Sequence, residues 1–324
     1  MYNISQKYFL QLVFFAKILI IAGAYFIISN KLLDHGAFNR QLLFEKFGSF
    51  KLLDYAFLLF LLLLSLTNWI LEILKWRSLV KFVKPISFAK AMDQSLSSLT
   101  ASLITPNRIG EYGAKAIYFV KGERSKIMLL NFLGNFSQMS ITLVFGFLGL
   151  FILWENQPPF KFNSSALLGY SIVLVLLMSC AILLRKKWRP WFSSLKKQFL
   201  SIPYATHKRA CLYSVLRYLV FSHQFYFFLL FFGVDIQYVM AMPLNLSMYF
   251  IASVIPGFVI FDWLVKGSVA VSLFGYYGVN EIIVLSITGF MWIFNFALPS
   301  LVGMFFVLTF DGSTLKLKQS EVLK

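Results

Sequence analysis

Long apolar runs separated by short polar segments dominate the sequence. Six of these runs are long enough to cross a bilayer as helices, because about 20 apolar residues span its hydrocarbon core. Two further regions mix apolar and polar residues, and each contains a proline that interrupts the helical pattern. The pattern predicts an all-α polytopic membrane protein. Its predicted transmembrane helices cover residues of about 8–29, 55–74, 127–154, 166–184, 212–232 and 282–310.

The composition agrees with a membrane location. Charged residues make up only 13% of the chain and hydrophobic residues 59%, whereas soluble domains carry about 25% charged residues. The formal net charge of +17 would suit a nucleic-acid partner, but the basic residues stand in short loops between apolar runs. Basic loops of this kind mark the cytoplasmic side of a membrane protein. We therefore expect no nucleic-acid partner, and we expect both termini in the cytoplasm.

The first interrupted region covers residues 86–122 and reads TPNRIGEYGAKA at its centre. We expect its helix to stop at Pro106 and to restart toward Tyr112, with Gly110 close to the break. Basic residues flank both ends, so the region is predicted to enter the membrane from the cytoplasm and return, as a re-entrant helical hairpin. Broken helices at membrane depth survive only where they are buried in protein or line a wet cavity.

A second interrupted region covers residues 236–280 and breaks at Pro256–Gly257. Its segment ASVIPGFVIFDWLVKGS aligns without gaps on ASLITPNRIGEYGAKAI, which places an aspartate on a glutamate and a lysine on a lysine. Acidic rather than basic residues flank this region, so it is predicted to enter from the opposite face of the membrane.

Span, hairpin and span therefore occur twice with opposite orientation, within a single membrane domain of residues 1–324. The two repeats are predicted at about 55–154 and 211–310. Inverted repeats whose broken helices meet near the midplane are typical of transporters.

Two acid–lysine pairs carry the candidate chemistry. Glu111 and Lys115, and likewise Asp262 and Lys266, stand at i and i+4, where they meet on one helix face. A lone charge at the centre of a transmembrane helix costs about 2.5–3.5 kcal/mol even on the gentler scale. These four groups must therefore pair with each other, line a hydrated cavity or hold a charged ligand. The structural alternative is that both pairs only lock the hairpins to their neighbours.

Arg108 favours a ligand. A guanidinium beside the N-terminus of a broken helix, near free backbone donors, suits a phosphate group. The predicted substrate-binding residues are Arg108, Glu111, Lys115, Asp262 and Lys266. Other polar residues could line the same cavity or simply form hydrogen bonds between helices: Asp93, Asn131, Asn135, Gln138, Arg217 and His223.

The central motif resembles the lysylphosphatidylglycerol synthase transmembrane-region family. The first motif of that family is a Thr/Ser–Pro–x–Arg–x–Gly–Glu run, which is filled here by Thr105, Pro106, Arg108, Gly110 and Glu111. Its second motif is a Pro–Gly break followed by an acid. That motif is filled only loosely, because aromatic residues replace its usual glycine-rich Arg–Glu form: Phe258, Phe261 and Trp263.

The resemblance implies a flippase-like lipid translocase of the bacterial cytoplasmic membrane. Its substrate would be an anionic or other phosphate-bearing lipid, or a lipid-linked precursor, and a lipid synthase is an expected partner. The alternative is a non-catalytic membrane subunit that presents a lipid-linked sugar to a glycosyltransferase. Because the chain ends soon after its last span, we expect it not to make an aminoacyl lipid itself.

No catalytic signature stands out in the sequence. It contains no HExxH motif, no nucleophile elbow and no cluster with metal-ligand spacing. We therefore expect neither enzymatic activity nor a metal or cofactor.

Overall fold

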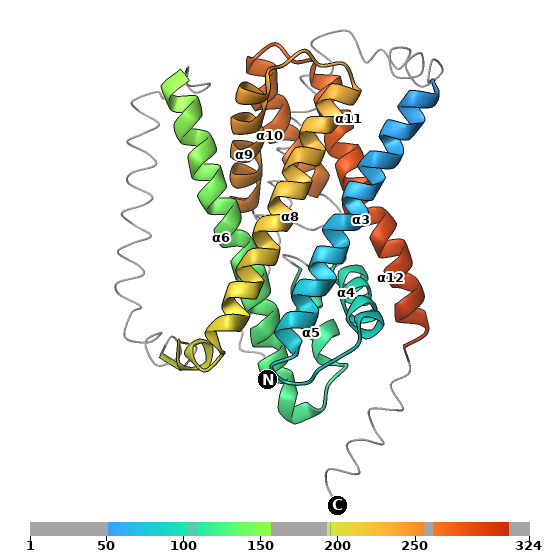
Figure 1. The fold of residues 1–324 in the computed structure, drawn as a ribbon, viewed down its shortest axis with the longest axis vertical. Coiled ribbons are helices and arrows are strands. Elements are labelled where there is room, and N and C mark those ends of the chain that lie inside the picture. Colours follow the sequence, from blue (N-terminus) through green and yellow to red (C-terminus); the bar gives the residue numbers. More distant parts are fainter. Residues whose placement is uncertain are drawn as a thin grey trace, which may run out of the picture.

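Helices form all the regular structure that the computed structural model describes, which covers residues 51–103, 105, 108–156, 193–194, 196–255 and 262–310 (Figure 1). Four of the predicted spans are confirmed as helices long and apolar enough to cross a membrane. They are α3 (Leu52–Val80), α6 (Arg124–Asn156), α8 (Tyr204–Phe231) and the run formed by α11 (Glu281–Trp292), a π-helix (Ile293–Ala297) and α12 (Leu298–Leu308). The predicted spans at 8–29 and 166–184 lie outside the described residues.

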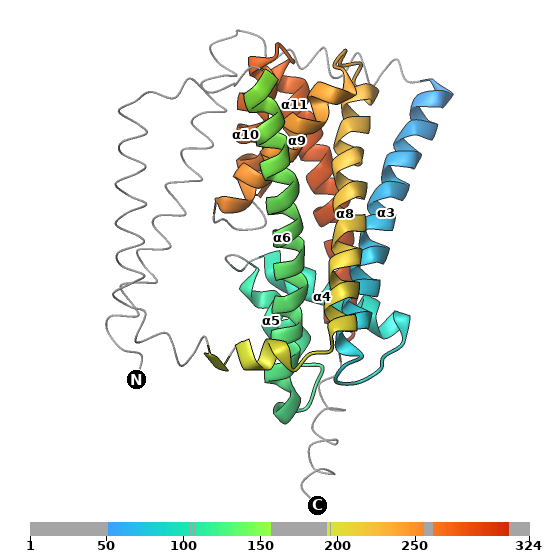
Figure 2. The ribbon, with the colours of Figure 1, turned by 60° about the vertical axis from the view of Figure 1, so that its left-hand side comes forward.

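Both interrupted regions form a pair of short helices. The first pair is α4 (Phe88–Leu103) and α5 (Ile109–Ala116), followed by the short helix η1 (Lys121–Glu123). The second pair is α9 (Tyr238–Val254) and α10 (Asp262–Tyr276). The helices therefore break where the sequence predicts, although Pro106, Pro256 and Gly257 themselves lie outside the described residues. Figures 1 and 2 show α4 and α5 toward one end of the molecule and α9 and α10 toward the other.

The long helices hold the two short pairs in place. Helix α3 packs along α8, α6 packs against α9, and α12 packs against α4. Figure 2 shows α6 running past both short pairs. Helix α6 thus contacts both short pairs, α5 of the first and α9 of the second.

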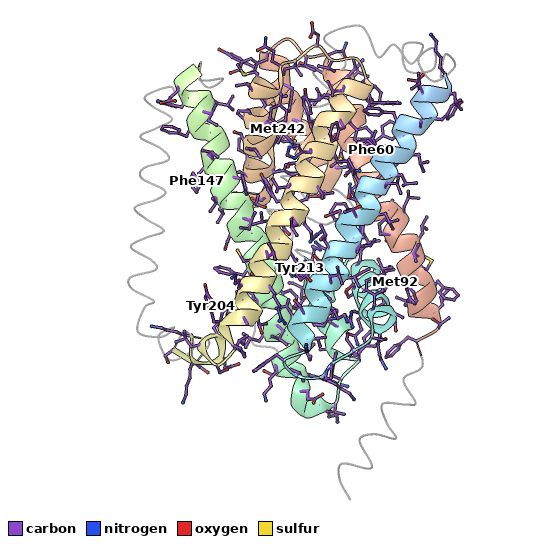
Figure 3. All side chains as sticks on the ribbon, viewed as in Figure 1. Phe60, Met92, Phe147, Tyr204, Tyr213 and Met242 are labelled. Atoms are coloured by element: carbon purple, nitrogen blue, oxygen red, sulfur yellow. The ribbon has the colours of Figure 1, made fainter. Side chains whose placement is uncertain are left out.

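Apolar side chains cover the outside of the long helices. Phe60 on α3 and Phe147 on α6 are both exposed, and Figure 3 shows them on the outer parts of the molecule. Exposed apolar faces of this extent are not stable in water and mark a membrane-facing surface. The bilayer, rather than a large buried core, therefore accommodates much of the apolar content of the chain.

Helix α3 continues further than the sequence predicts. The predicted span ends near Leu74, but the helix runs to Val80. Trp69, Glu72, Lys75 and Trp76 near its C-terminal end are all buried, and each has a polar partner inside the protein. The Trp76 Nε1–H, for example, donates to Gln94 Oε1 at 2.8 Å.

Glycines allow the tight helix crossings. A Cβ added to Gly149 on α6 would lie 2.8 Å from Leu246 Cβ on α9. A Cβ on Gly303 of α12 would collide with the backbone oxygen of Leu96 on α4. Small residues let transmembrane helices approach closely, and packing replaces the hydrophobic effect as the attraction between them. The crossings α6–α9 and α12–α4 therefore depend on these positions.

Gly303→Ala is expected to destabilise the protein by about 1–3 kcal/mol, because overpacking of a close contact costs that much. The matched control is Gly289→Ala in the same predicted span, where an added Cβ meets no atom within 4 Å. Thermal unfolding of the purified protein in detergent measures both changes. Equal midpoints for the two variants would contradict the close crossing of α12 and α4.

Candidate functional site

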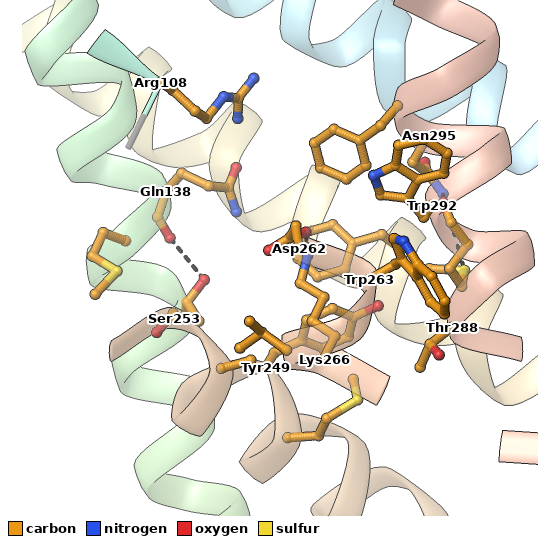
Figure 4. A pocket seen from close by; sticks show the side chains of 18 of the residues that line it. Arg108, Gln138, Tyr249, Ser253, Asp262, Trp263, Lys266, Thr288, Trp292 and Asn295 are labelled. Atoms are coloured by element: carbon orange, nitrogen blue, oxygen red, sulfur yellow. Dashed lines mark hydrogen bonds and ion pairs between the residues drawn. The ribbon is translucent and has the colours of Figure 1, made fainter. Parts of the chain in front are cut away.

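A cavity of about 590 Å³ lies where the two helix breaks meet the long helices. The middle residues of the long helices line it, including Asn68 of α3, Gln138 of α6, Arg217 of α8 and Asn295 of the π-helix. Figure 4 shows Arg108 and Gln138 on one side of this cavity and Trp263, Trp292 and Thr288 on the other. Its charged lining residues are Glu72, Arg108, Arg217, Asp262 and Lys266.

Arg108 stands at the start of α5, in the break of the first pair. Its backbone is left-handed (φ 58°), and it is the one non-glycine residue with positive φ in the described part of the chain. The Gly110 N–H donates to Thr105 Oγ1 at 2.9 Å. A Cβ on Gly110 would lie 2.5 Å from the Ala101 carbonyl oxygen, so this turn requires glycine. The turn leaves the Arg108 side chain 38% exposed, at the edge of the cavity.

Glu111 is buried behind the cavity between two cations. Lys115 Nζ lies 2.8 Å from Glu111 Oε1, and Arg108 Nε lies 3.5 Å from Glu111 Oε2. The same ammonium donates to Asn131 Oδ1 at 2.8 Å and stands 4.4 Å from the centroid of the Trp76 ring. The i, i+4 pair predicted from the sequence therefore forms, but Glu111 and Lys115 do not line the cavity.

Glu72 is the centre of a second network of the same kind. Its Oε2 accepts from the Arg217 guanidinium and lies 2.8 Å from Lys75 Nζ. Arg217 also donates to Asn68 Oδ1 at 3.0 Å and to Gln138 Oε1 at 3.4 Å. Arg217 is among the residues predicted to line the cavity, but its partner Glu72 is not. Glu72 follows an apolar run and precedes basic residues. A glutamate so close to a predicted span end carries no signal of burial.

Asn295 joins three helices beneath this second network. It accepts from Asn68 Nδ2 at 2.9 Å and donates to Gln224 Oε1 at 2.9 Å. Its carbonyl oxygen accepts from Trp69 Nε1 at 2.9 Å, and the Phe294 carbonyl oxygen accepts from Ser65 Oγ at 2.6 Å. Side chains of α3 thus satisfy carbonyl oxygens of the π-helix. Local π-helices are frequent at functional sites, and this one fixes Asn68 and, through it, Arg217.

Asp262 and Lys266 form the third charged group, on α10. Lys266 Nζ lies 2.6 Å from Asp262 Oδ2, and both side chains are partly exposed at the cavity. The ammonium also stands 5.3 Å from the centroid of the Phe296 ring, and Arg108 Cζ stands 5.9 Å from the same centroid. Phe296 therefore lies between a cation of the first short pair and a cation of the second.

The charges at the cavity do not balance. Among the described residues, the three networks hold five cationic side chains and three carboxylates, an excess of two positive charges. These networks consist of Glu72 with Lys75 and Arg217, Glu111 with Arg108 and Lys115, and Asp262 with Lys266. A cavity with this excess attracts an anion. No cluster of three or more His, Cys, Asp or Glu side chains in the described part of the chain could hold a metal ion.

The other predicted lining residues divide into three groups. Asn135, Gln138 and Arg217 line the cavity, and Asn131 lies behind it on Lys115. The structure places Asp93 and His223 elsewhere. Asp93 Oδ1 accepts from the Tyr118 hydroxyl at 2.7 Å, and His223 Nε2 lies 2.9 Å from the Tyr238 hydroxyl on an exposed face of α8. For these two residues the structure supports the alternative given above, a hydrogen bond to a neighbouring segment, rather than a place in the lining.

The chain matches a model of a known protein family. The family model described as "Lysylphosphatidylglycerol synthase TM region" matches residues 14–303, which is most of the chain. No curated protein gives a significant match. The matched range contains every residue of the three charged networks.

Lys115→Met is expected to destabilise the protein by about 3–5 kcal/mol, since it removes the nearest cation from a buried carboxylate. Arg108→Ala is the matched comparison. It leaves Glu111 with Lys115 at 2.8 Å, so its expected loss is below about 1 kcal/mol, as for an exposed ion pair. Thermal unfolding in detergent distinguishes the two. Glu111→Gln should restore much of the stability of Lys115→Met, and a failure to do so would contradict the paired arrangement.

Proposed function

Because this chain belongs to the lysylphosphatidylglycerol synthase transmembrane-region family, we propose that it is a flippase-like transporter, which moves a phosphate-bearing lipid between the two leaflets of a membrane. The observation that carries this proposal is the excess of positive charge around a cavity at mid-length of the spans. The chain acts by binding and moving the lipid rather than by catalysing a reaction.

The position of the cavity fits transport. Its lining residues stand near the middle of all four long helices, so the cavity lies close to the midplane when these helices span a bilayer. Transporters bind their substrates at this depth, between broken helices. A headgroup held there has left one leaflet and not yet reached the other.

The two arginines fit a phosphate. Arg108 and Arg217 both line the cavity, and each belongs to a network in which a lysine also neutralises the glutamate. Their guanidinium groups can therefore turn to a ligand without leaving a carboxylate unpaired. A guanidinium presents parallel N–H donors that match two phosphate oxygens. Asp262 and Lys266 line the same cavity and contact the remainder of the headgroup.

An inverted repeat supports alternating access. In the proposed repeat, α3, α4, α5 and α6 correspond to α8, α9, α10 and the α11–α12 run. Two pairs of contacts then become equivalent. The α6–α9 contact matches the α12–α4 contact, and the α5–α6 contact matches the α10–α11 contact. We propose that both short pairs are re-entrant hairpins that enter from opposite faces. Relative movement of the two repeats would then open the cavity to each leaflet in turn.

The charge distribution supports an orientation. Basic residues gather at the end of the molecule that holds the C-terminus of α3 and the N-termini of α6 and α8, and this end is predicted to be cytoplasmic. They include Arg77, Lys81, Lys84, Lys121, Arg124, Lys126, Lys196, Lys197, Lys208 and Arg209. In a bacterium, the membrane concerned is the cytoplasmic membrane.

Arg108→Ala is expected to lower the rate of lipid translocation at least tenfold while thermal stability stays near that of the wild type. Translocation is measured in proteoliposomes as the movement of fluorescent phosphatidylglycerol to the outer leaflet, with and without a proton gradient. Arg108→Lys should restore little activity, because an ammonium group lacks the planar pair of donors.

Arg209→Ala is the control for Arg108→Ala, because Arg209 is exposed at the basic end of the molecule, away from the cavity. It should leave the translocation rate unchanged. Wild-type translocation no faster than in protein-free liposomes, or an unchanged rate in a stable Arg108→Ala protein, would contradict the proposal.

Single cysteines should report opposite faces for the two hairpins. Gly122 follows the first short pair and Asn280 follows the second. In a background without Cys180 and Cys211, Gly122→Cys should react only from the cytoplasm and Asn280→Cys only from outside. Labelling with a membrane-impermeant maleimide in whole cells measures this. Reaction of both cysteines from one face would rule out the inverted arrangement.

A further inference from the structure

The charge distribution in the cavity selects among phosphate lipids. We infer that the site takes an anionic lipid whose phosphate carries an uncharged, hydroxylated headgroup, and that it excludes lipids whose headgroup carries an ammonium group. This inference rests on the proposed function. It concerns the part of the headgroup that is attached to the phosphate, and this part would contact other side chains than the two arginines.

Every carboxylate of the three networks already has a cation in contact. Lys75 lies 2.8 Å from Glu72, Lys115 lies 2.8 Å from Glu111, and Lys266 lies 2.6 Å from Asp262. A cationic headgroup would have to displace one of these lysines. Lys75 and Lys115 are fully buried and cannot move into water. The described part of the cavity thus offers no free anion to an incoming ammonium group.

Lys266 would also repel an ammonium headgroup. It is the only one of the three lysines that lines the cavity, and its ammonium group stands 5.7 Å from the Tyr249 ring centroid and 5.3 Å from that of Phe296. These two ring faces would otherwise be available to a second cation. Because Lys266 already uses them, an ammonium headgroup would meet a like charge, and like charges in a cavity of low dielectric repel strongly.

The wall opposite Arg108 suits a polyol. Trp263 and Trp292 lie on this side of the cavity together with Thr288, and Asn295 is close by (Figure 4). None of these side chains carries a charge. Indole rings offer flat apolar surfaces with an N–H donor at the edge, whereas Thr288 and Asn295 already form hydrogen bonds within the protein. The C–H faces and hydroxyl groups of a glycerol, inositol or sugar headgroup match such a wall.

The cavity is large enough for both parts of one headgroup. Arg108, Arg217 and the two tryptophans line the same cavity of about 590 Å³. A phosphate beside the arginines therefore leaves space for a headgroup of several carbon atoms beside Trp263 and Trp292. The inference separates this chain from a transporter of aminoacyl lipids, whose headgroups are cationic.

Binding of four short-chain lipids with the same acyl groups tests the inference. Dioctanoyl phosphatidylglycerol, phosphatidylinositol, phosphatidylethanolamine and phosphatidic acid are titrated separately into the purified full-length protein, below the concentrations at which they form micelles. Phosphatidylglycerol and phosphatidylinositol should bind at least tenfold more tightly than phosphatidylethanolamine. Phosphatidic acid should also bind, because it presents the phosphate alone.

Lys266→Met should change this preference. It frees the Asp262 carboxylate and removes the repelling charge, so phosphatidylethanolamine should bind at least tenfold more tightly than it binds to the wild type. Asp262→Asn combined with Lys266→Met should lose that gain. Lys208→Met, at an exposed lysine far from the cavity, is the control and should bind all four lipids as the wild type does. Thermal unfolding shows which variants are folded.

Trp263→Leu and Trp292→Leu test the polyol wall. Each substitution should weaken the binding of phosphatidylinositol at least threefold and leave the binding of phosphatidic acid unchanged. Their failure to do so would overturn the assignment of this wall.

The outcomes separate the inference from the proposed function. If phosphatidylethanolamine binds the wild type as tightly as phosphatidylglycerol, and both depend on Arg108, the inference is overturned while the phosphate site stands. If none of the four lipids binds, or if Arg108→Ala changes none of their affinities, the proposed function itself fails.

Discussion

Two buried glutamates, each held between two cations, are the constraint on which this structure depends. Taking a carboxylate out of water costs several kcal/mol even after the surroundings relax, and only close partners with good geometry offset that cost. Glu72 and Glu111 each have two such partners. Arg217 of α8 reaches Glu72 of α3, and Lys115 of α5 contacts Asn131 of α6 and the Trp76 ring of α3. These charged groups therefore come together only when α3, α5, α6 and α8 are assembled.

The rest of the fold follows from bringing those charges together at mid-depth. Helix α4 ends at Leu103 and α5 begins at Ile109, and this break places Arg108 at the cavity and Glu111 behind it. The backbone groups at such a break need protein or water around them. Close crossings at Gly149 and Gly303 supply protein on either side, and the π-helix around Asn295 supplies polar side chains from a third direction.

The sequence predicts the parts of this site that are local and misses those that are not. Glu111 with Lys115, and Asp262 with Lys266, could be recognised because an ion pair at i, i+4 is visible within one helix. The four described spans followed from length and hydropathy alone. The burial of Glu72 and Asn295 could not be found in this way, since Arg217, which contacts Glu72, and Gln224, which contacts Asn295, are more than 70 residues away in the chain. Their burial follows from packing that no short motif records.

Incomplete neutralisation is what distinguishes a binding site from a structural network. A cavity in which every charge had one partner would be stable when empty and would gain little from a ligand. Here the three networks of the described chain leave two positive charges in excess beside a cavity. In the function proposed above, an anionic headgroup reduces this excess, and any ligand that binds only the folded state also stabilises it. The buried lysines pair the glutamates and so stabilise the protein when the cavity is empty. The arginines remain for the phosphate of the proposed substrate. In that proposal, lipid affinity and protein stability depend on different members of the same networks.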